Sequence, residues 1–252
     1  GSAYSLKLDK IDRSALRVMI GLRKYICSQF KPNVAKAMYD LFKSKNVMDF
    51  SMGWGDRLAG FFASQNTELY VGVDPRKENH PIYREQADYY EGQLTMFETM
   101  KKVDFYCEAA EDFYYDGYED TFDIIFTSPP YFNVERYSHD DNQSWVRYKD
   151  IDNWNTQFLQ KALDNMLPTL RSGGKLCINI SDVYSPSAGK KAWSKICDPM
   201  NDFIQSYGGM EYKGCIGMEM AKRPNSGGAG TAKDTKQYTE ESLQLAKETK
   251  NK

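Results

Sequence analysis

Long apolar runs are absent from this chain of 252 residues. No stretch of about 18 apolar residues occurs, as a membrane-spanning helix would require. The sequence also does not open with a charged segment followed by an apolar one, as an export signal does. We therefore expect a soluble protein that is not exported and has no membrane partner.

Cysteine and histidine are few and scattered. The five cysteines include no Cys-x-x-Cys pair, and neither of the two histidines lies near a cysteine in the sequence. A structural zinc site is therefore not expected, nor is any other metal site. An odd number of unpaired cysteines is typical of a reducing compartment, which points to the cytoplasm.

Neither sign of charge dominates the composition. The 33 Lys and Arg residues are nearly balanced by 35 Asp and Glu residues, which gives a formal net charge of −2. Proteins that coat nucleic acid by bulk charge are usually strongly basic, so this class is disfavoured. An enzyme that holds a short stretch of nucleic acid through a local basic patch is still allowed.

Apolar residues are present in the amount that one α/β domain needs, at 41% of the chain. Helical periodicity predicts helices over residues 11–26, 33–44, 58–62, 151–170 and 200–207. Short apolar runs predict strands over residues 47–50, 69–73, 103–107, 122–127, 174–180 and 215–220. This alternation predicts a Rossmann-like α/β fold with a doubly wound, mostly parallel sheet. We expect a single domain over residues 3–222, with an insertion over 132–150 and a flexible or loosely helical tail over 223–252.

A glycine pair follows the first predicted strand, in the run Asp49-Phe50-Ser51-Met52-Gly53-Trp54-Gly55-Asp56. Glycine permits a sharp turn and lets a ligand approach the backbone closely. Asp74 ends the next strand, where a carboxylate can accept hydrogen bonds from both hydroxyls of a ribose. Because Leu58 stands where a dinucleotide-binding loop has its third glycine, the pattern favours a nucleoside cofactor without a pyrophosphate. An ordinary tight turn would explain the glycines alone.

Three residues after the third predicted strand are candidates for the adenine edge of such a cofactor. They are Ala110, Glu111 and Asp112. The alternative interpretation is that the two acidic side chains face water or cap a helix.

The run Thr127-Ser128-Pro129-Pro130-Tyr131 directly follows the fourth predicted strand, at the edge where open α/β sheets bind ligands. Two prolines cannot continue a β-ladder, and they hold Ser128 in an extended conformation. The Ser128 hydroxyl and the Pro129 carbonyl can then accept the two protons of an adenine or cytosine amine. Tyr131 offers a face on which an extruded base can stack. A simple turn explains the prolines, but not their place after a glycine turn and a ribose acid.

At these motifs the sequence resembles the amino-methylating DNA methyltransferases, which act on adenine N6 or cytosine N4, and most closely their small phage and bacterial members. Residues 127–131 resemble the catalytic motif and 49–56 the cofactor motif of that family. Phe30-Lys31-Pro32 resembles the segment that closes over the methionine carboxylate, and residues 173–175 resemble the turn into the fifth strand.

The resemblance implies S-adenosylmethionine as cofactor, base flipping, direct methyl transfer without a metal, and a role in DNA methylation of the restriction-modification kind. Family members with an acidic residue in place of Ser128 are typically adenine-specific, whereas serine is more often seen with cytosine N4. No large target-recognition domain is evident after the motif, which leaves the insertion and the tail to contact the substrate.

The insertion interleaves basic and aromatic residues, a pattern that suits phosphate contact and base stacking. The candidate substrate-binding residues are Phe132, Asn133, Arg136, Tyr137, Trp145, Arg147 and Tyr148. The alternative, held at even weight, is a loop that Trp145 fixes over a helix.

Two other functions remain open. An RNA adenine N6-methyltransferase would use the same chemistry, because the motif recognises an amine and not a sugar. A non-catalytic subunit of a methyltransferase complex would keep the fold without the activity. A small-molecule substrate is disfavoured, because the motif suits planar conjugated amines. Nucleic acid is the expected partner, with DNA favoured over RNA, and a homodimer or a partner subunit is left open.

Overall fold

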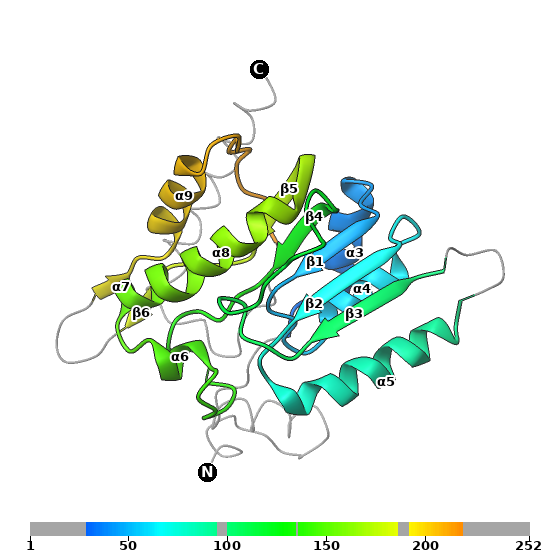
Figure 1. Ribbon diagram of the computed structural model, residues 1–252, viewed down its shortest axis with the longest axis horizontal. Helices are drawn as coiled ribbons and strands as arrows, with labels where there is room; N and C mark the ends of the chain where they lie inside the picture. Colours follow the sequence, from blue (N-terminus) through cyan, green and yellow to red (C-terminus); the bar gives the residue numbers. More distant parts are fainter. Residues whose placement is uncertain (1–28, 95–99, 135, 186–191, 219–252) are drawn as a thin grey trace, which may run out of the picture. The chain divides into compact units, whose positions relative to one another are not determined.

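A five-stranded parallel sheet forms the centre of the unit of residues 29–214 (Figure 1). The structure is a computed structural model that describes residues 29–94, 100–134, 136–185 and 192–218. The strands follow the order β3-β2-β1-β4-β5, and all four neighbouring pairs are parallel. Their bounds are β1 Asn46–Asp49, β2 Leu69–Val73, β3 Lys102–Tyr106, β4 Phe122–Thr127 and β5 Leu170–Ile178. The strand order reverses between β1 and β4, and open α/β sheets bind ligands outside the carboxyl ends of such a switch point.

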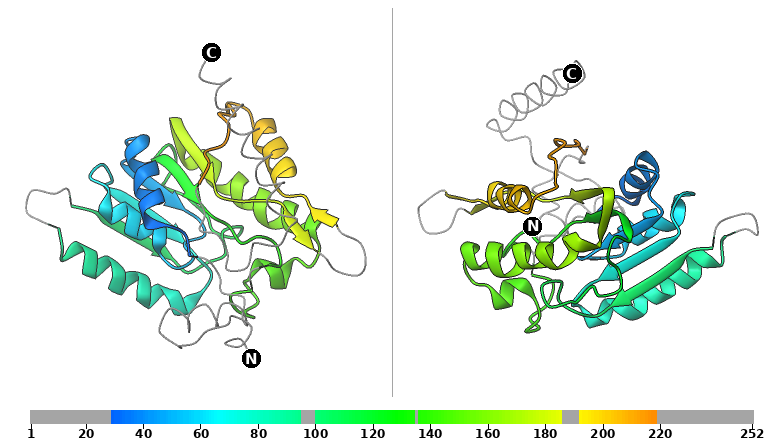
Figure 2. Two further views of the ribbon diagram at one scale, coloured as in Figure 1. Left: turned by 180° about the vertical axis from the view of Figure 1, so that it is seen from behind. Right: turned by 45° about the horizontal axis from the view of Figure 1, so that its top comes forward.

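Helices cover both faces of this sheet. One face carries α3 (Pro32–Leu41), α4 (Asp56–Ala63) and α5 (His80–Glu91). The other carries the π-helix η2 (Trp154–Gln160), α8 (Lys161–Met166) and α9 (Cys197–Ser206). The view from behind shows α3 over the sheet, on the side opposite to α8 (Figure 2).

The smaller elements lie in the connections. They are η1 (Lys77–Asn79), α6 (Ser144–Arg147), α7 (Ile151–Asn153), η3 (Leu167–Thr169), and the antiparallel pair β6 (Val183–Ser185) and β7 (Ala192–Ser194).

Alternation along the strands builds two cores from one sheet, since successive side chains of a strand point to opposite faces. In β1, Val47 packs with the α3 and α4 residues while Met48 packs with the η2 and α8 residues. In β4, Ile124 and Ile125 divide in the same way, and all four side chains are fully buried. Parallel strands covered on both faces are typically continuous apolar runs, which is the pattern that the sequence shows here.

The predicted Rossmann-like α/β fold is confirmed, and the strands of the sheet lie within a few residues of their predicted bounds. The sequence did not indicate α5, because this helix buries only Tyr83 and Ala87 and is otherwise polar. The helix predicted over 151–170 is divided into α7, η2, α8 and η3, and its last residue already belongs to β5.

The strand predicted over residues 215–220 is not formed in its described part. Residues 215–218 carry no regular secondary structure and are mostly exposed. Gly214 precedes them with a φ of 100°, a conformation that interrupts an extended strand. Residues 219 and 220 lie outside the described residues, as do the helix predicted over 11–26 and the tail over 223–252.

The chain divides into two compact units, one of residues 29–214 and one that joins residues 1–28 to residues 215–252. The predicted domain limits of 3 and 222 lie outside the described residues and stay a prediction. None of the helices described for this chain combines the length and apolar character that a membrane crossing needs.

Candidate active site

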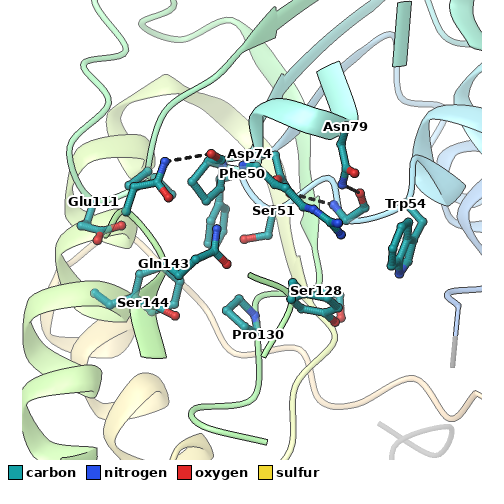
Figure 3. Close-up of a pocket in the computed structure, with 18 residues that line it drawn as sticks. Phe50, Ser51, Trp54, Asp74, Asn79, Glu111, Ser128, Pro130, Gln143 and Ser144 are labelled. Atoms are coloured by element: carbon teal, nitrogen blue, oxygen red, sulfur yellow. Dashed lines mark hydrogen bonds between the residues drawn. The ribbon is translucent and has the colours of Figure 1, made fainter. Parts of the chain in front are cut away.

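A cleft of about 650 Å³, part of it open to solvent, lies beyond the carboxyl ends of the strands (Figure 3). Segments that follow β1, β2, β3 and β4 all contribute to it, as does the insertion. It is lined by Phe50, Ser51, Gly53, Trp54, Asp74, Pro75, Arg76, Asn79, Ala109, Ala110, Glu111, Ser128, Pro130, Tyr137, Asn142, Gln143, Ser144 and Phe158. The structure therefore brings the predicted cofactor loop, ribose acid and catalytic motif to one place.

The glycine turn is fixed in position by the end of β2 and the start of α5. Gly53 and Gly55 have φ angles of 60° and 80°, which favour glycine over any other residue. The Gly53 amide donates to the Asp74 carboxylate at 2.9 Å, while its carbonyl accepts from Asn79 at 2.9 Å and from the Tyr83 hydroxyl at 2.5 Å. The turn is thus held in one conformation by the protein itself.

Asp74 lines the cleft with a side chain that is almost fully buried. Its two carboxylate oxygens accept from the backbone amides of Gly53 (2.9 Å) and Arg76 (3.0 Å). Burial raises the pKa of Asp74 to about 6, although both backbone hydrogen bonds act to lower it. Each oxygen keeps a lone pair for a further donor, such as a ribose hydroxyl.

Asp49 does not line the cleft, but it links the cofactor motif to the catalytic motif. The carboxylate is fully buried and accepts from Arg57 (Nε at 2.8 Å), the Tyr70 hydroxyl (2.7 Å) and the Thr127 hydroxyl (2.9 Å). Arg57 also donates to the Ser51 carbonyl. Burial alone would lower the pKa of the Arg57 guanidinium, but its interaction with Asp49 prevails and the pKa is raised. The first residue of the cofactor motif is thereby bonded directly to the first residue of the catalytic motif.

Asn179, the residue that follows β5, organises the catalytic motif. Its backbone amide donates to the Thr127 carbonyl at 2.9 Å. Its backbone carbonyl accepts from the Ser128 hydroxyl (3.1 Å) and the Tyr131 hydroxyl (3.3 Å), and its side-chain amide donates to the same two oxygens at 3.1 and 3.2 Å. One residue therefore fixes both functional side chains of the motif.

Glu111 joins the third strand's loop to the insertion. Its side chain is buried and accepts from Arg147 at 2.9 Å and from the Tyr148 hydroxyl at 3.2 Å. Arg147 also pairs with Asp112, which contacts Lys161 at 3.3 Å. Burial raises the pKa of Glu111, although Arg147 acts to lower it. Two predicted substrate residues thus contact two predicted cofactor residues.

Trp145 is the centre of a small cluster within the insertion. Its indole nitrogen donates to the Ser138 carbonyl at 2.9 Å, and the cations of Arg136 and Lys149 lie 5.1 and 5.3 Å from its ring centroid. His139 meets the same ring edge-on at 5.1 Å. This arrangement agrees with the alternative of a loop held by Trp145, while Arg136 stays exposed.

Several predicted site residues do not line the cleft. Phe30 packs on Phe126 and under the Arg57 guanidinium, ahead of α3. Phe132 is buried against Trp154 with a φ of 50°, so it is a core residue and does not offer a binding surface. The other predicted residues outside the lining are Lys31, Pro32, Asp49, Gly55, Asp56, Asp112, Pro129, Tyr131, Asn133, Arg136, Trp145, Arg147 and Tyr148.

Sequence reasoning missed Asn179, Arg57, Asn142 and Gln143 as site residues. Asn179 had a detectable signal, because a polar residue at the carboxyl end of a strand lies at the edge where ligands bind. Arg57 had none, since its partner Asp49 and its burial follow only from the packed helix. The two insertion residues lie in a segment without periodicity, from which no position relative to the cleft could be inferred.

A family model described as DNA methylase, of the N6 and N4 class, matches residues 122–252, slightly more than half of the chain. The matched part includes the catalytic motif, Asn179 and the insertion. The chain belongs to the DNA methylase family. The predicted resemblance is confirmed, and the protein is a methyltransferase whose methyl donor is S-adenosylmethionine. No curated protein is similar enough to be matched.

Solved methyltransferase structures show a weaker likeness. The StiE O-methyltransferase domain is 14% identical over 69% of this chain and 48% of its own, with a TM-score of 0.43. A methyltransferase from Geobacter sulfurreducens is 15% identical over 70% of this chain and 74% of its own, with a TM-score of 0.37. The plantazolicin methyltransferase BpumL is 13% identical over 71% of this chain and 56% of its own, with a TM-score of 0.37. This chain thus spans about half the length of two of these three structures.

The residues of the cleft fit the adenosyl part of this cofactor. A Cβ built on Gly53 would meet no protein atom within 4 Å, so the backbone there is open to a close ligand. The Asp74 carboxylate suits two ribose hydroxyls. Asn142 Oδ1 and Gln143 Nε2 are buried and have no hydrogen-bond partner among the residues that the structure describes, which suits a polar ligand.

Proposed function

We propose that this methyltransferase modifies the exocyclic amine of cytosine (N4) or adenine (N6) in DNA, after the target base has been flipped out of the helix. The observation that supports this most directly is the Ser128–Asn179 arrangement beside the cofactor cleft. Serine in place of an acidic residue tilts the proposal toward cytosine. Residues Ser51, Gly53, Asp74, Ala110 and Glu111 would hold the cofactor, and the bound cofactor would supply an electrophilic sulfonium methyl group.

Ser128 is arranged to accept a hydrogen bond and not to donate one. Its hydroxyl proton is directed at the Asn179 carbonyl, and one of its two lone pairs receives the Asn179 side-chain amide. The remaining lone pair can accept a proton of a substrate amine. Together with the Pro129 carbonyl, this acceptor would draw the nitrogen toward tetrahedral geometry and expose its lone pair, as catalysis by positioning requires.

Tyr131 would stack on the flipped base. Its hydroxyl is bonded to Asn179, so the ring is oriented before the substrate arrives. Stacking on an aromatic side chain contributes about 1–3 kcal/mol per base. Tyr137, which lines the cleft, and the exposed Asn133 and Arg136 are proposed contacts for the DNA around that base.

Biological context is proposed on the same basis. A role in DNA modification of the restriction-modification kind, in phage or bacteria, follows from the family resemblance. A cytoplasmic location suits the cysteines, because Cys107, Cys177 and Cys197 are free thiols. A homodimer or a partner subunit would supply target recognition.

Methyl incorporation into separate polymers tests the proposal. Labelled S-adenosylmethionine is incubated with single-stranded DNA, duplex DNA and RNA, and the labelled nucleoside is identified by mass after digestion. We expect N4-methylcytosine or N6-methyladenine from DNA. Label on RNA alone would favour the RNA methyltransferase, and no label despite cofactor binding would favour the non-catalytic subunit.

A further inference from the structure

Two neighbouring residues of the insertion have polar atoms that the protein leaves without partners. Asn142 Oδ1 and Gln143 Nε2 are both buried, and neither has a hydrogen-bond partner within the described part of the chain. Gln143 is only 6% exposed, and both residues line the cleft. Buried polar groups are nearly always hydrogen-bonded, so two unsatisfied atoms in neighbouring residues of the lining indicate a polar ligand there.

The orientation of Asn142 is fixed by its second contact. Its Nδ2 donates to the Pro75 carbonyl at 2.8 Å. A carbonyl oxygen can only accept, so the Nδ2 must face Pro75 and the Oδ1 must face the other way. Pro75 directly follows Asp74, so Asn142 lies at the ribose end of the cleft, and Figure 3 shows Gln143 projecting toward Ser51.

An acceptor and a donor side by side match the edge of adenine. Adenine offers an amine donor at N6 beside ring-nitrogen acceptors, and side-chain amides recognise this combination in other settings. Apolar side chains line the same cleft, as a flat base requires: Phe50, Ala109, Ala110 and Phe158.

We propose that Asn142 and Gln143 recognise the adenine of S-adenosylmethionine, so that the insertion is part of the cofactor site as well as the substrate side. The Asn142 Oδ1 accepts from the N6 amine, and the Gln143 amide donates to a ring nitrogen. The cofactor's adenine is favoured over a target adenine because Asn142 is bonded to the residue after the ribose acid. Arg147 and Tyr148 support this placement, since they attach the insertion to Glu111.

Calorimetric binding without nucleic acid tests this inference. The probes are S-adenosylhomocysteine and S-inosylhomocysteine, in which a carbonyl oxygen replaces the N6 amine and N1 carries a proton. The wild-type protein is expected to prefer the adenosyl ligand by about tenfold, because the inosyl oxygen would face the Asn142 acceptor. Equal affinity for the two ligands in the wild-type protein would overturn the proposal without any variant.

Two variants then assign the residues. Gln143→Leu is expected to weaken S-adenosylhomocysteine binding by about tenfold. Asn142→Leu is expected to reduce the preference for the adenosyl ligand, because the inosyl oxygen then faces no acceptor. Loss of the Pro75 bond alone would weaken both ligands equally, so the ratio separates recognition from positioning. The matched control is Gln157→Leu, which makes the same change at an exposed residue of η2 and should leave both affinities unchanged.

The outcomes against the proposal are distinct. Unchanged affinity in Gln143→Leu, or an unchanged ratio in Asn142→Leu, would show that the pair does not contact the cofactor. If binding is unchanged but Gln143→Leu alters the choice between adenine and cytosine in methylated DNA, the pair recognises the target base. The inference rests on S-adenosylmethionine as methyl donor and not on the polymer, so the binding assay can succeed even if DNA is not the substrate.

Discussion

Asp49, behind the glycine turn, and Gln143, in the lining of the cleft, are 0% and 6% exposed, and they differ in how their polar atoms are satisfied. The Asp49 carboxylate receives hydrogen bonds from Arg57, Tyr70 and Thr127. The Gln143 Nε2 donates to no acceptor among the described residues. The glycine-turn side is therefore complete without a ligand, while the insertion side is completed by one. Substitutions can therefore test the preorganised glycine turn and the ligand-dependent insertion separately.

Removing Arg57 is expected to have the largest effect on stability. Arg57→Met leaves the Asp49 charge buried without its partner, which should lower the free energy of unfolding by about 3–5 kcal/mol. Urea denaturation measures this change. The control is Lys45→Met, which breaks the exposed pair with Glu68 and should cost at most about 1 kcal/mol. Equal effects of the two substitutions would show that the Asp49 network does not stabilise the turn.

Asn179 is expected to affect the rate and not the cofactor affinity. Asn179→Ala should lower the methylation rate by about ten- to a hundredfold, because Ser128 and Tyr131 lose their shared partner. A double-mutant cycle with Ser128→Ala should be strongly non-additive, since the two residues act as a unit. Additive losses of rate would contradict direct positioning of Ser128 by Asn179.

Cofactor binding should weaken in mild acid. Burial raises the pKa of Asp74 to about 6, so the carboxylate that accepts the ribose is present above pH 6 and is lost as pH falls through it. Between pH 7.5 and pH 5, affinity should fall by about tenfold. Other charged or titratable groups lie near this carboxylate and have to be separated from it. They are His80, Arg76 and Asp49 around Asp74, and Glu111 in the same cleft.

The Asp74→Asn variant separates these groups in the same pH series. It should bind the cofactor more weakly at neutral pH and show a flat profile. A slope retained in Asp74→Asn would assign the titration to Glu111 or to another neighbour.

The smallest expected effect belongs to the exposed part of the insertion. Arg136→Ala should leave stability and cofactor affinity nearly unchanged, because Arg136 is exposed. If it contacts a phosphate, the slope of log affinity for DNA against log salt should fall by about one. An unchanged salt slope would limit Arg136 to its contact with Trp145.

The fold was largely predictable because its strands are buried on both faces and therefore stand out as apolar runs. The catalytic and cofactor motifs were predictable because they follow strands directly, so their place at the sheet edge comes from topology. The partners of Asp49 were not, since residues 8, 21 and 78 positions away converge only in the packed protein. The role of the insertion was not predictable either. Its aromatic and basic composition suggested contact with DNA, but some of these residues interact with one another, as Arg136 and Lys149 do with Trp145.

The most direct test is a comparison of wild-type protein and Ser128→Ala in one DNA methylation assay, with S-adenosylhomocysteine affinity measured in parallel. We expect labelled N4-methylcytosine or N6-methyladenine from the wild type. The variant should show a loss of about a hundredfold in rate, with cofactor affinity unchanged. Full activity in Ser128→Ala, or a labelled product that is not an exocyclic amine, would contradict the proposed chemistry.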